Sequence, residues 1–155
     1  MSSKLSILID AVNHRLTAGL LALNDPAGPL TTEIVVISED TKDLETEINK
    51  AIAQIGMMVL IGEPHYENST PTAPQSGLKV LFAVVVGETP TIWRDAAGLK
   101  PKARAVSEYV HRLLAQYPVP GFLPLRVTRN DFFPDKKRNL RELSIEAITT
   151  LDPIS

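Results

Sequence analysis

The stretch "LKVLFAVVVGE", residues 78–88, is the most apolar segment of this 155-residue chain. It is rich in β-branched and aromatic residues, which are typical of strands. A continuous apolar run of this length is also typical of a strand that is buried on both faces. We therefore expect residues 78–88 to form the central strand of a sheet.

Two shorter apolar runs precede it, "EIVVIS" at 33–38 and "MMVLIG" at 57–62, and both predict strands. Asp40 can cap a helix between them, over about 41–55, and Gly56 is a natural stop. The apolar stripe of that helix is Leu44, Ile48, Ala51, Ile52 and Ile55. A strand, a helix and a strand in this order are compatible with a right-handed parallel crossover.

Two further helices are expected, one before these strands in the sequence and one after them. An amphipathic stripe over about 3–20 predicts the first, with Ser3 as its cap. The second is predicted to begin at Pro101 and to end before Pro118. Their apolar stripes are Leu5, Leu8, Ile9, Val12 and Leu16, and Ala103, Val106, Val110, Leu113, Leu114 and Tyr117.

The chain closes with two alternating segments, Leu123–Phe133 and Leu140–Thr150, which predict a β-hairpin. Pro134 and Asp135 begin its turn, and "KKRN" at 136–139 forms the tip. The predicted fold class is therefore α+β, with a single mixed, mostly antiparallel sheet flanked by about three helices. A chain of this length fits one domain over residues 1–155.

Composition excludes several kinds of chemistry. The chain has no cysteine, so disulfides and thiolate catalysis are ruled out. It also has no glycine-rich phosphate loop, no G-x-S-x-G motif and no H-E-x-x-H motif. No signal peptide or membrane span is expected. We predict no catalytic residue, no metal and no cofactor.

The segment "EPHYENSTPTAPQSG", residues 63–77, has three prolines and no periodicity, which predicts a long loop. Glu63, His65 and Glu67 are alternate residues, which project to the same side of an extended segment and could together bind a divalent ion. A solvated loop is the favoured interpretation. His65 and the adjacent Tyr66 are kept as candidates for an interaction surface.

The segment "RNDFFPDKKRNLRE", residues 129–142, combines basic and aromatic side chains. With Arg126 it would attract phosphates if its charges shared one face, although basic residues at a hairpin also protect against unwanted strand pairing. Phe132 and Phe133 should point to opposite faces, so one is expected in the core. The other, together with Trp93, is a candidate contact residue. The basic candidates are Arg126, Arg129, Lys136, Lys137, Arg138 and Arg141.

Charge is distributed unevenly along the chain, whose net charge is −2. Residues 1–90 hold 5 Lys/Arg against 11 Asp/Glu, whereas residues 91–155 hold 11 against 7. If copies assembled head to tail, an acidic surface could face a basic one, and a contact of this kind that closes makes a ring.

The order of elements resembles that of the tail terminator and tail-completion (neck) proteins of tailed bacteriophages. The resemblance lies in "LKVLFAVVVGE", "KARAVSEYVHRLLAQYP" and "LPLRVTRNDFFPDKKRNLRELSIEAIT", and it covers roughly residues 30–150. The segment "ISEDTKDLETEINKAIAQIGMMVLIGEP" also resembles small proteins encoded among phage structural genes. The helix expected at about 41–55 departs from the simplest terminator layout.

This resemblance implies a non-enzymatic virion protein of the tail or neck, assembled in the host cytoplasm. It implies a homo-oligomeric ring, commonly a hexamer, that contacts the tail tube protein and a head-completion or connector protein. DNA would pass through the lumen without sequence recognition. On this interpretation the basic hairpin lies at a subunit interface or near the lumen.

Two alternatives stay open from the sequence. One is a small cytoplasmic α/β binding or enzyme domain that uses the 63–77 loop as a lid. The other is a nucleic-acid-binding module built around the hairpin, which would bind DNA with a steep salt dependence.

Overall fold

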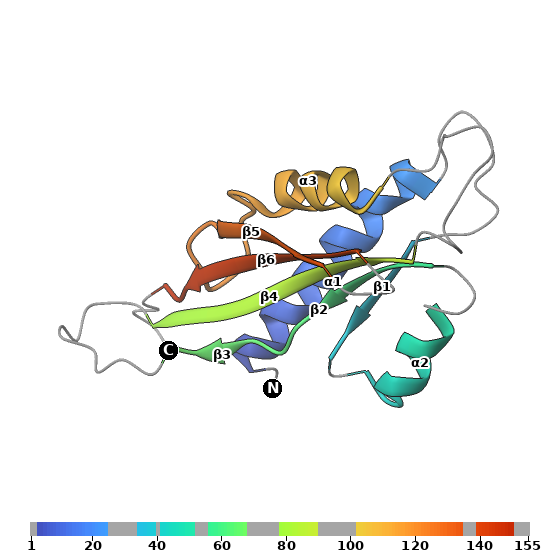
Figure 1. Cartoon of the computed structure of the whole chain (residues 1–155). Helices are drawn as coiled ribbons and strands as arrows, with labels where there is room; N and C mark the ends of the chain where they lie inside the picture. Colours follow the sequence, from blue (N-terminus) through green and yellow to red (C-terminus); the bar gives the residue numbers. More distant parts are fainter. Residues whose placement is uncertain are drawn as a thin grey trace.

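The computed structural model describes residues 3–24, 34–39, 41–51, 56–67, 78–89, 102–134 and 139–150. These residues form three helices and six strands, and the α+β class is confirmed (Figure 1). The helices are α1 (Lys4–Asn24), α2 (Leu44–Lys50) and α3 (Ala103–Leu114). The strands are β1 (Val35–Ser38), β2 (Met57–Ile61), β3 (His65–Tyr66), β4 (Lys79–Glu88), β5 (Arg126–Pro134) and β6 (Asn139–Ile148).

The six strands form one mixed sheet in the order β1-β2-β4-β6-β5, and the short β3 pairs with β4. β1 and β2 are parallel, as expected of two strands joined through a helix. Every other pairing is antiparallel. The prediction of a mixed, mostly antiparallel sheet with 78–88 at its centre is therefore confirmed.

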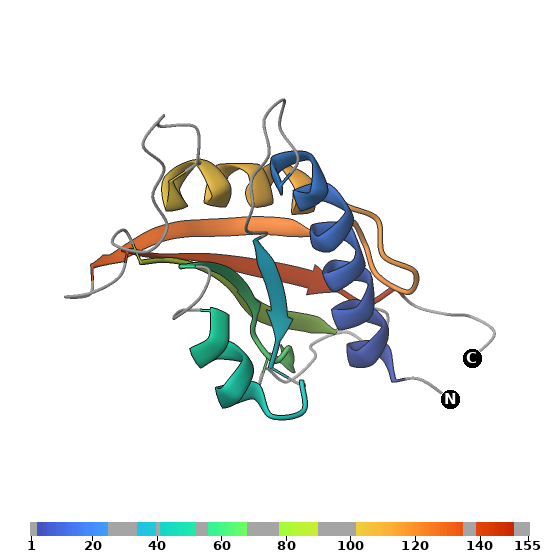
Figure 2. The ribbon, with the colours of Figure 1, turned by 90° about the vertical axis from the view of Figure 1, so that its right-hand side faces the viewer.

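The helices cover the two faces of the sheet unequally (Figure 2). α1 and α3 pack on one face, α1 against β1 and β2 and α3 against β4, β5 and β6. α2 lies on the other face, where it packs against β1. The main core lies under α1 and α3, and it includes Leu8, Leu16, Val59, Val84, Val106, Val110, Leu143 and Ile145. A small second core under α2 is built from Ile37, Ala51 and Met58.

β4 is central, but it is not buried on both faces as the sequence suggested. Val80, Phe82 and Val84 are buried under the helices, whereas Leu81 and Ala83 alternate with them and are only partly buried. Among the described residues, the helix on that face is α2, and it packs at the β1–β2 edge. We call the part of that face formed by β4, β6 and β5 the uncovered face.

The helix ends differ from the sequence prediction in detail. Ser3 caps α1, because the Ser6 amide donates a 3.1 Å hydrogen bond to the Ser3 Oγ, but the helix continues to Asn24. α2 begins at Leu44, after Asp43 in a left-handed conformation with φ 59°. Asp40 and Pro101, the expected start signals, lie outside the described residues. No helix in the described part of the chain is long and apolar enough to cross a membrane.

The closing hairpin is confirmed. β5 and β6 pair from Arg126↔Glu146 to Pro134↔Asn139, and the register shifts once, between Val127 and Arg129. The last pair brackets residues 135–138, the predicted turn, which lie outside the described residues. The described ends of the chain also meet, since the Lys4 Nζ donates to the Thr150 carbonyl at 3.3 Å.

Candidate functional site

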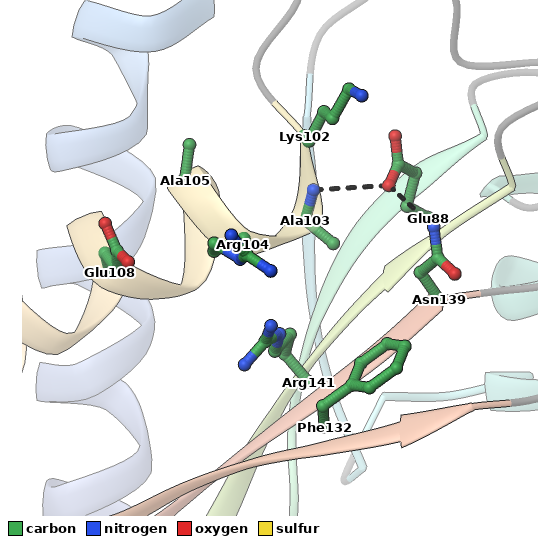
Figure 3. A pocket seen from close by; sticks show the side chains of 9 residues that line it. All are labelled: Glu88, Lys102, Ala103, Arg104, Ala105, Glu108, Phe132, Asn139 and Arg141. Carbon is green, nitrogen blue, oxygen red and sulfur yellow. Dashed lines mark hydrogen bonds between the residues drawn. The ribbon is translucent and has the colours of Figure 1, made fainter.

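A cleft of about 520 Å³ opens between the first turn of α3 and the far end of the β5–β6 hairpin (Figure 3). We call it the hairpin cleft. Its lining comes from β4, α3, β5 and β6, which are distant in sequence. The side chains that matter for its chemistry are Glu88, Lys102, Arg104, Phe132, Asn139 and Arg141.

Glu88 joins the elements that form this cleft. Its side chain is 5% exposed, and its Oε1 accepts hydrogen bonds from the Ala103 amide and the Asn139 Nδ2, both at 3.3 Å. The carboxylate sits at the positive end of the α3 dipole. Glu88 therefore ties the start of α3 to the end of the hairpin and holds the cleft walls in place.

Sequence reasoning missed Glu88, although a signal was present. The first turn of α3 holds no acidic residue, and its N-cap, Lys102, makes no side-chain capping hydrogen bond. The free amides of a helix start need a partner, so an acceptor from elsewhere in the chain is required. Glu88, the last residue of β4, supplies this acceptor to the Ala103 amide.

The mouth of the cleft is cationic and aromatic. The Arg141 guanidinium lies over the Phe132 ring, 5.0 Å from its centroid, and Figure 3 shows Arg104 opposite them on α3. Lys102 and Arg104 are exposed. Of the two carboxylates that line the cleft, Glu88 is already engaged by Ala103 and Asn139, which leaves Glu108. Such a surface favours a partner that is acidic and offers an apolar or planar group.

The predicted basic cluster does not share one face. The strand register places Phe132 and Arg141 on the side of α3, beside the cleft. Arg126 and Arg129 lie on the uncovered face, where they pair with Glu146 at 3.5 Å and Asp131 at 3.0 Å. Two of the expected free cations are thus paired with carboxylates on the opposite face from the cleft.

The expectation that one of the two phenylalanines is in the core is wrong, because Phe132 and Phe133 are each 47% exposed. Phe132 lies beside the first turn of α3 rather than beneath the helix. Phe133 pairs in register with Leu140 on the uncovered face. Trp93 and the hairpin-tip residues Lys136, Lys137 and Arg138 lie outside the described residues.

His65 and Tyr66 are both exposed and form β3. The neighbouring Glu67 forms an ion pair with Lys79 at 3.5 Å, and the Glu63 amide donates to the Glu39 Oε2 at 2.9 Å. Within the described ranges, no three His, Asp or Glu side chains are grouped so that they could hold a metal ion.

His65 borders a second hollow, of about 460 Å³, on the uncovered face. Leu81 and Ala83 of β4 and Ser144 of β6 contribute to its floor. Its carboxylates are Glu39, Glu63 and Glu142. We call it the acidic groove.

Comparison with known proteins identifies the fold. No protein-family model matches the chain, and no curated protein is similar to it in sequence. A chain in the solved structure of the virion of a native gene transfer agent particle is similar over 96% of this chain and 98% of its own length, with a TM-score of 0.58 and 18% identity. A second solved chain, which bears no functional name, is similar over 98% and 99% with a TM-score of 0.57 and 14% identity. The chain therefore shares its fold with a component of the gene transfer agent virion.

Proposed function

We propose that this chain is a non-enzymatic structural protein of a phage-like virion. The observation that carries the proposal is the shared fold with a gene transfer agent virion chain, which extends over nearly the whole of both chains. The likeness therefore extends over the fold as a whole and is more than a shared motif. The resemblance of the sequence to phage tail and neck proteins supports the same conclusion independently.

Within the virion, the proposed place is the head–tail junction, as a tail terminator or tail-completion ring. The partners would be further copies of the chain, in a ring such as a hexamer, with the tail tube protein and a head-completion or connector protein. DNA would pass through the lumen without being read. The single-domain organisation over 1–155 belongs to the same proposal.

The charges of the described residues support head-to-tail assembly. Acidic side chains gather around β1 and α2, at one edge of the sheet, and include Glu39, Glu45, Glu47 and Glu63. Basic side chains gather around α3 and the hairpin, at the other edge, and include Lys102, Arg104, Arg129 and Arg141. A subunit with opposite charges at its two edges can attract the next copy in the same orientation.

The test is the native mass of the purified chain by light scattering, in low and high salt, followed by negative-stain imaging. We expect rings, formed by the chain alone or after addition of a tail tube protein. A strict monomer that neither forms rings nor binds tube protein would overturn the proposal.

One observation favours a second candidate, a small binding or enzyme domain. The hairpin cleft has the volume of an ordinary ligand pocket. Residues 63–67, the described start of the predicted lid, are not among its lining residues. The rest of that segment, 68–77, lies outside the described residues. A thermal-shift screen with small anionic ligands separates the two candidates. A specific stabilisation that Arg141→Ala abolishes would favour the binding domain.

A further inference from the structure

The described residues that line the hairpin cleft carry more positive than negative charge. Lys102 and Arg104 are exposed at the start of α3, and Arg141 faces them from β6. In the part of the chain that the structure describes, none of these three cations takes part in an ion pair. The buried carboxylate of Glu88 already accepts two hydrogen bonds, so Glu108 is the one further acid among these lining residues.

The cleft also offers an aromatic surface beside its cations. The Phe132 side chain is 47% exposed, and the Arg141 guanidinium lies 5.0 Å from the centre of its ring. Figure 3 shows Arg104 on the facing wall. Aromatic and arginine side chains are enriched at protein contacts. Because Glu88 ties the two walls together, this surface is formed before any partner arrives, which lowers the cost of binding.

The helix α2 presents a surface of opposite charge. Its first turn holds Glu45 and Glu47, directly after the exposed Asp43, and no residue of the helix is buried. Among the described residues, none of these carboxylates forms an ion pair. Glu39 and Glu63 of the acidic groove follow β1 and β2, so they extend the same acidic edge of the sheet.

The α2 helix cannot enter the cleft of its own subunit. It packs against β1 on one face of the sheet, whereas the cleft lies on the other face, between α3 and the β5–β6 hairpin. The strand order β1-β2-β4-β6-β5 also places the two at opposite edges. The sheet therefore stands between them (Figure 2), and an α2 helix that enters this cleft belongs to another copy.

We propose that the first turn of α2 of one subunit docks in the hairpin cleft of the next. The inference rests on the proposed ring and names its contact. The carboxylates of Glu45 and Glu47 accept charge-assisted hydrogen bonds from Arg104 and Lys102, and the Phe132 ring packs on the aliphatic part of the turn.

This contact joins two different surfaces, at opposite edges of the sheet, so it is heterologous and repeats in one direction from copy to copy. The next copy then lies over α2, on the side of the sheet that carries the uncovered face. Electrostatic attraction between the two surfaces weakens as salt is added, so the contact is strongest at low ionic strength.

Engineered disulfides test the contact directly, because the chain has no cysteine of its own. One variant carries Thr46→Cys in the first turn of α2, and a second carries Ala105→Cys in the cleft lining. Both positions are exposed, and neither substitution changes a charge. The two are mixed at low ionic strength, oxidised, and separated by non-reducing electrophoresis, with a tag on one variant so that the mixed dimer differs in size from both homodimers. We expect the 46–105 cross-linked dimer to exceed either homodimer.

The matched control replaces the cleft cysteine by Ser6→Cys. Ser6 is exposed on α1, near the Lys4 side chain that bonds the Thr150 carbonyl, and it is not among the described residues that line the cleft. The 46–105 cross-link should exceed the 46–6 cross-link and should fall at high salt.

Charge substitutions then give the specificity. Glu45→Gln and Glu47→Gln together should lower the yield of the cross-link about fivefold, as expected of two exposed ion pairs. Reversing the cleft alone (Lys102→Glu and Arg104→Glu) or the turn alone (Glu45→Arg and Glu47→Arg) should abolish it. Mixing the two reversed variants should restore it, which also shows that both are folded.

The outcomes separate this inference from the proposed ring. Rings without a 46–105 cross-link, or cross-linking equal to the Ser6→Cys control, would overturn the docking contact and leave the ring intact. A 46–105 cross-link that follows the charge reversals would support the contact, even if rings closed only on a tube protein. Binding of a short DNA duplex that is lost with Lys102→Glu and Arg104→Glu, without the cross-link, would overturn the contact and assign the cleft to nucleic acid.

Discussion

The apolar residues on the two faces of the central strand β4 differ in burial. Along β4, Val80, Phe82 and Val84 are buried beneath α1 and α3, whereas Leu81 and Ala83 between them are only partly covered. Along β4 these residues are apolar on both faces, so the placement of the helices distinguishes the two sets. One face therefore stabilises the fold, and on the proposal of a ring the other would serve contacts between subunits.

The sharpest test of this difference is the same substitution on both faces. Leu143→Ala, on the helix-covered face of β6, should lower the free energy of unfolding by about 3 kcal/mol, because the side chain is fully buried and leaves a cavity. Leu81→Ala, on the uncovered face of β4, should cost about 1 kcal/mol or less, because its side chain is already part-exposed. Urea unfolding of the two variants measures both values. Equal losses would contradict the unequal faces.

Sequence pattern predicted the elements well because each depends on local information. The apolar run of β4, the stripe of α3 and the alternation of β6 all have the periods of their structures. The sequence did not show that half of β4 is uncovered. A continuous apolar run has the same pattern whether its second face packs against a helix of its own chain or is left partly exposed. Only the structure shows that α2 packs on the β1–β2 edge of that face.

Two glutamates, one on each face of the sheet, should differ in their contribution to stability. Glu88→Ala should lower the free energy of unfolding by about 1.5 kcal/mol, because the Ala103 amide and Asn139 lose their shared acceptor. Glu88→Gln should recover part of this loss, since its amide oxygen can still accept. Glu142→Ala, on the uncovered face, should change stability by less than about 0.5 kcal/mol. Chemical denaturation of the three variants is the measurement, and a Glu142 effect as large as that of Glu88 would argue against the assignment.

The candidate site was only partly predictable. Phe132 and Arg141 were found because aromatic and basic residues concentrate in one segment of sequence. Lys102, Arg104 and Glu88 were not, because the turn of α3 that meets the hairpin is about thirty residues away in the chain. The faces of the remaining β5 residues depend on the strand register. The register shifts between Val127 and Arg129. Because such a shift changes which residues share a face, the faces can be assigned only once the pairing is known.

The helix-covered face also depends on close contact between α1 and α3. A Cβ added at Gly19 would lie 2.5 Å from the Leu113 Cδ1, and the Tyr109 hydroxyl donates to the Gly19 carbonyl at 3.0 Å. Gly19→Ala should therefore destabilise by about 1 kcal/mol, because the overlap exceeds the gain in helix propensity. Leu113→Ala in the same chain should remove the penalty of the new methyl group. A double-mutant cycle measures the coupling, and strict additivity would show that the two positions do not meet.

The smallest effect is expected among the charges of the uncovered face. Lys79 lies 3.5 Å from Glu67 and 3.7 Å from Glu146, and Arg126 lies 3.5 Å from Glu146. Lys79, Glu67 and Arg126 are substantially exposed, whereas Glu146 is only 14% exposed. Because the cation itself is solvated, Lys79→Ala should cost only about 0.5 kcal/mol at low salt, and the cost should fall at high salt. Lys79→Met, which keeps the aliphatic stem, separates packing from charge.

The concentration dependence of this small effect reports on assembly. In an isolated subunit, the loss on Lys79→Ala should be the same at every protein concentration, because the network touches only its own chain. If a second copy covers the uncovered face, the same charges become buried at the contact, and their removal should cost more as the concentration rises. Denaturation of Lys79→Ala and Lys79→Met at widely separated concentrations measures this. A loss that is large, insensitive to salt and independent of concentration would mean that this face is covered within the subunit itself.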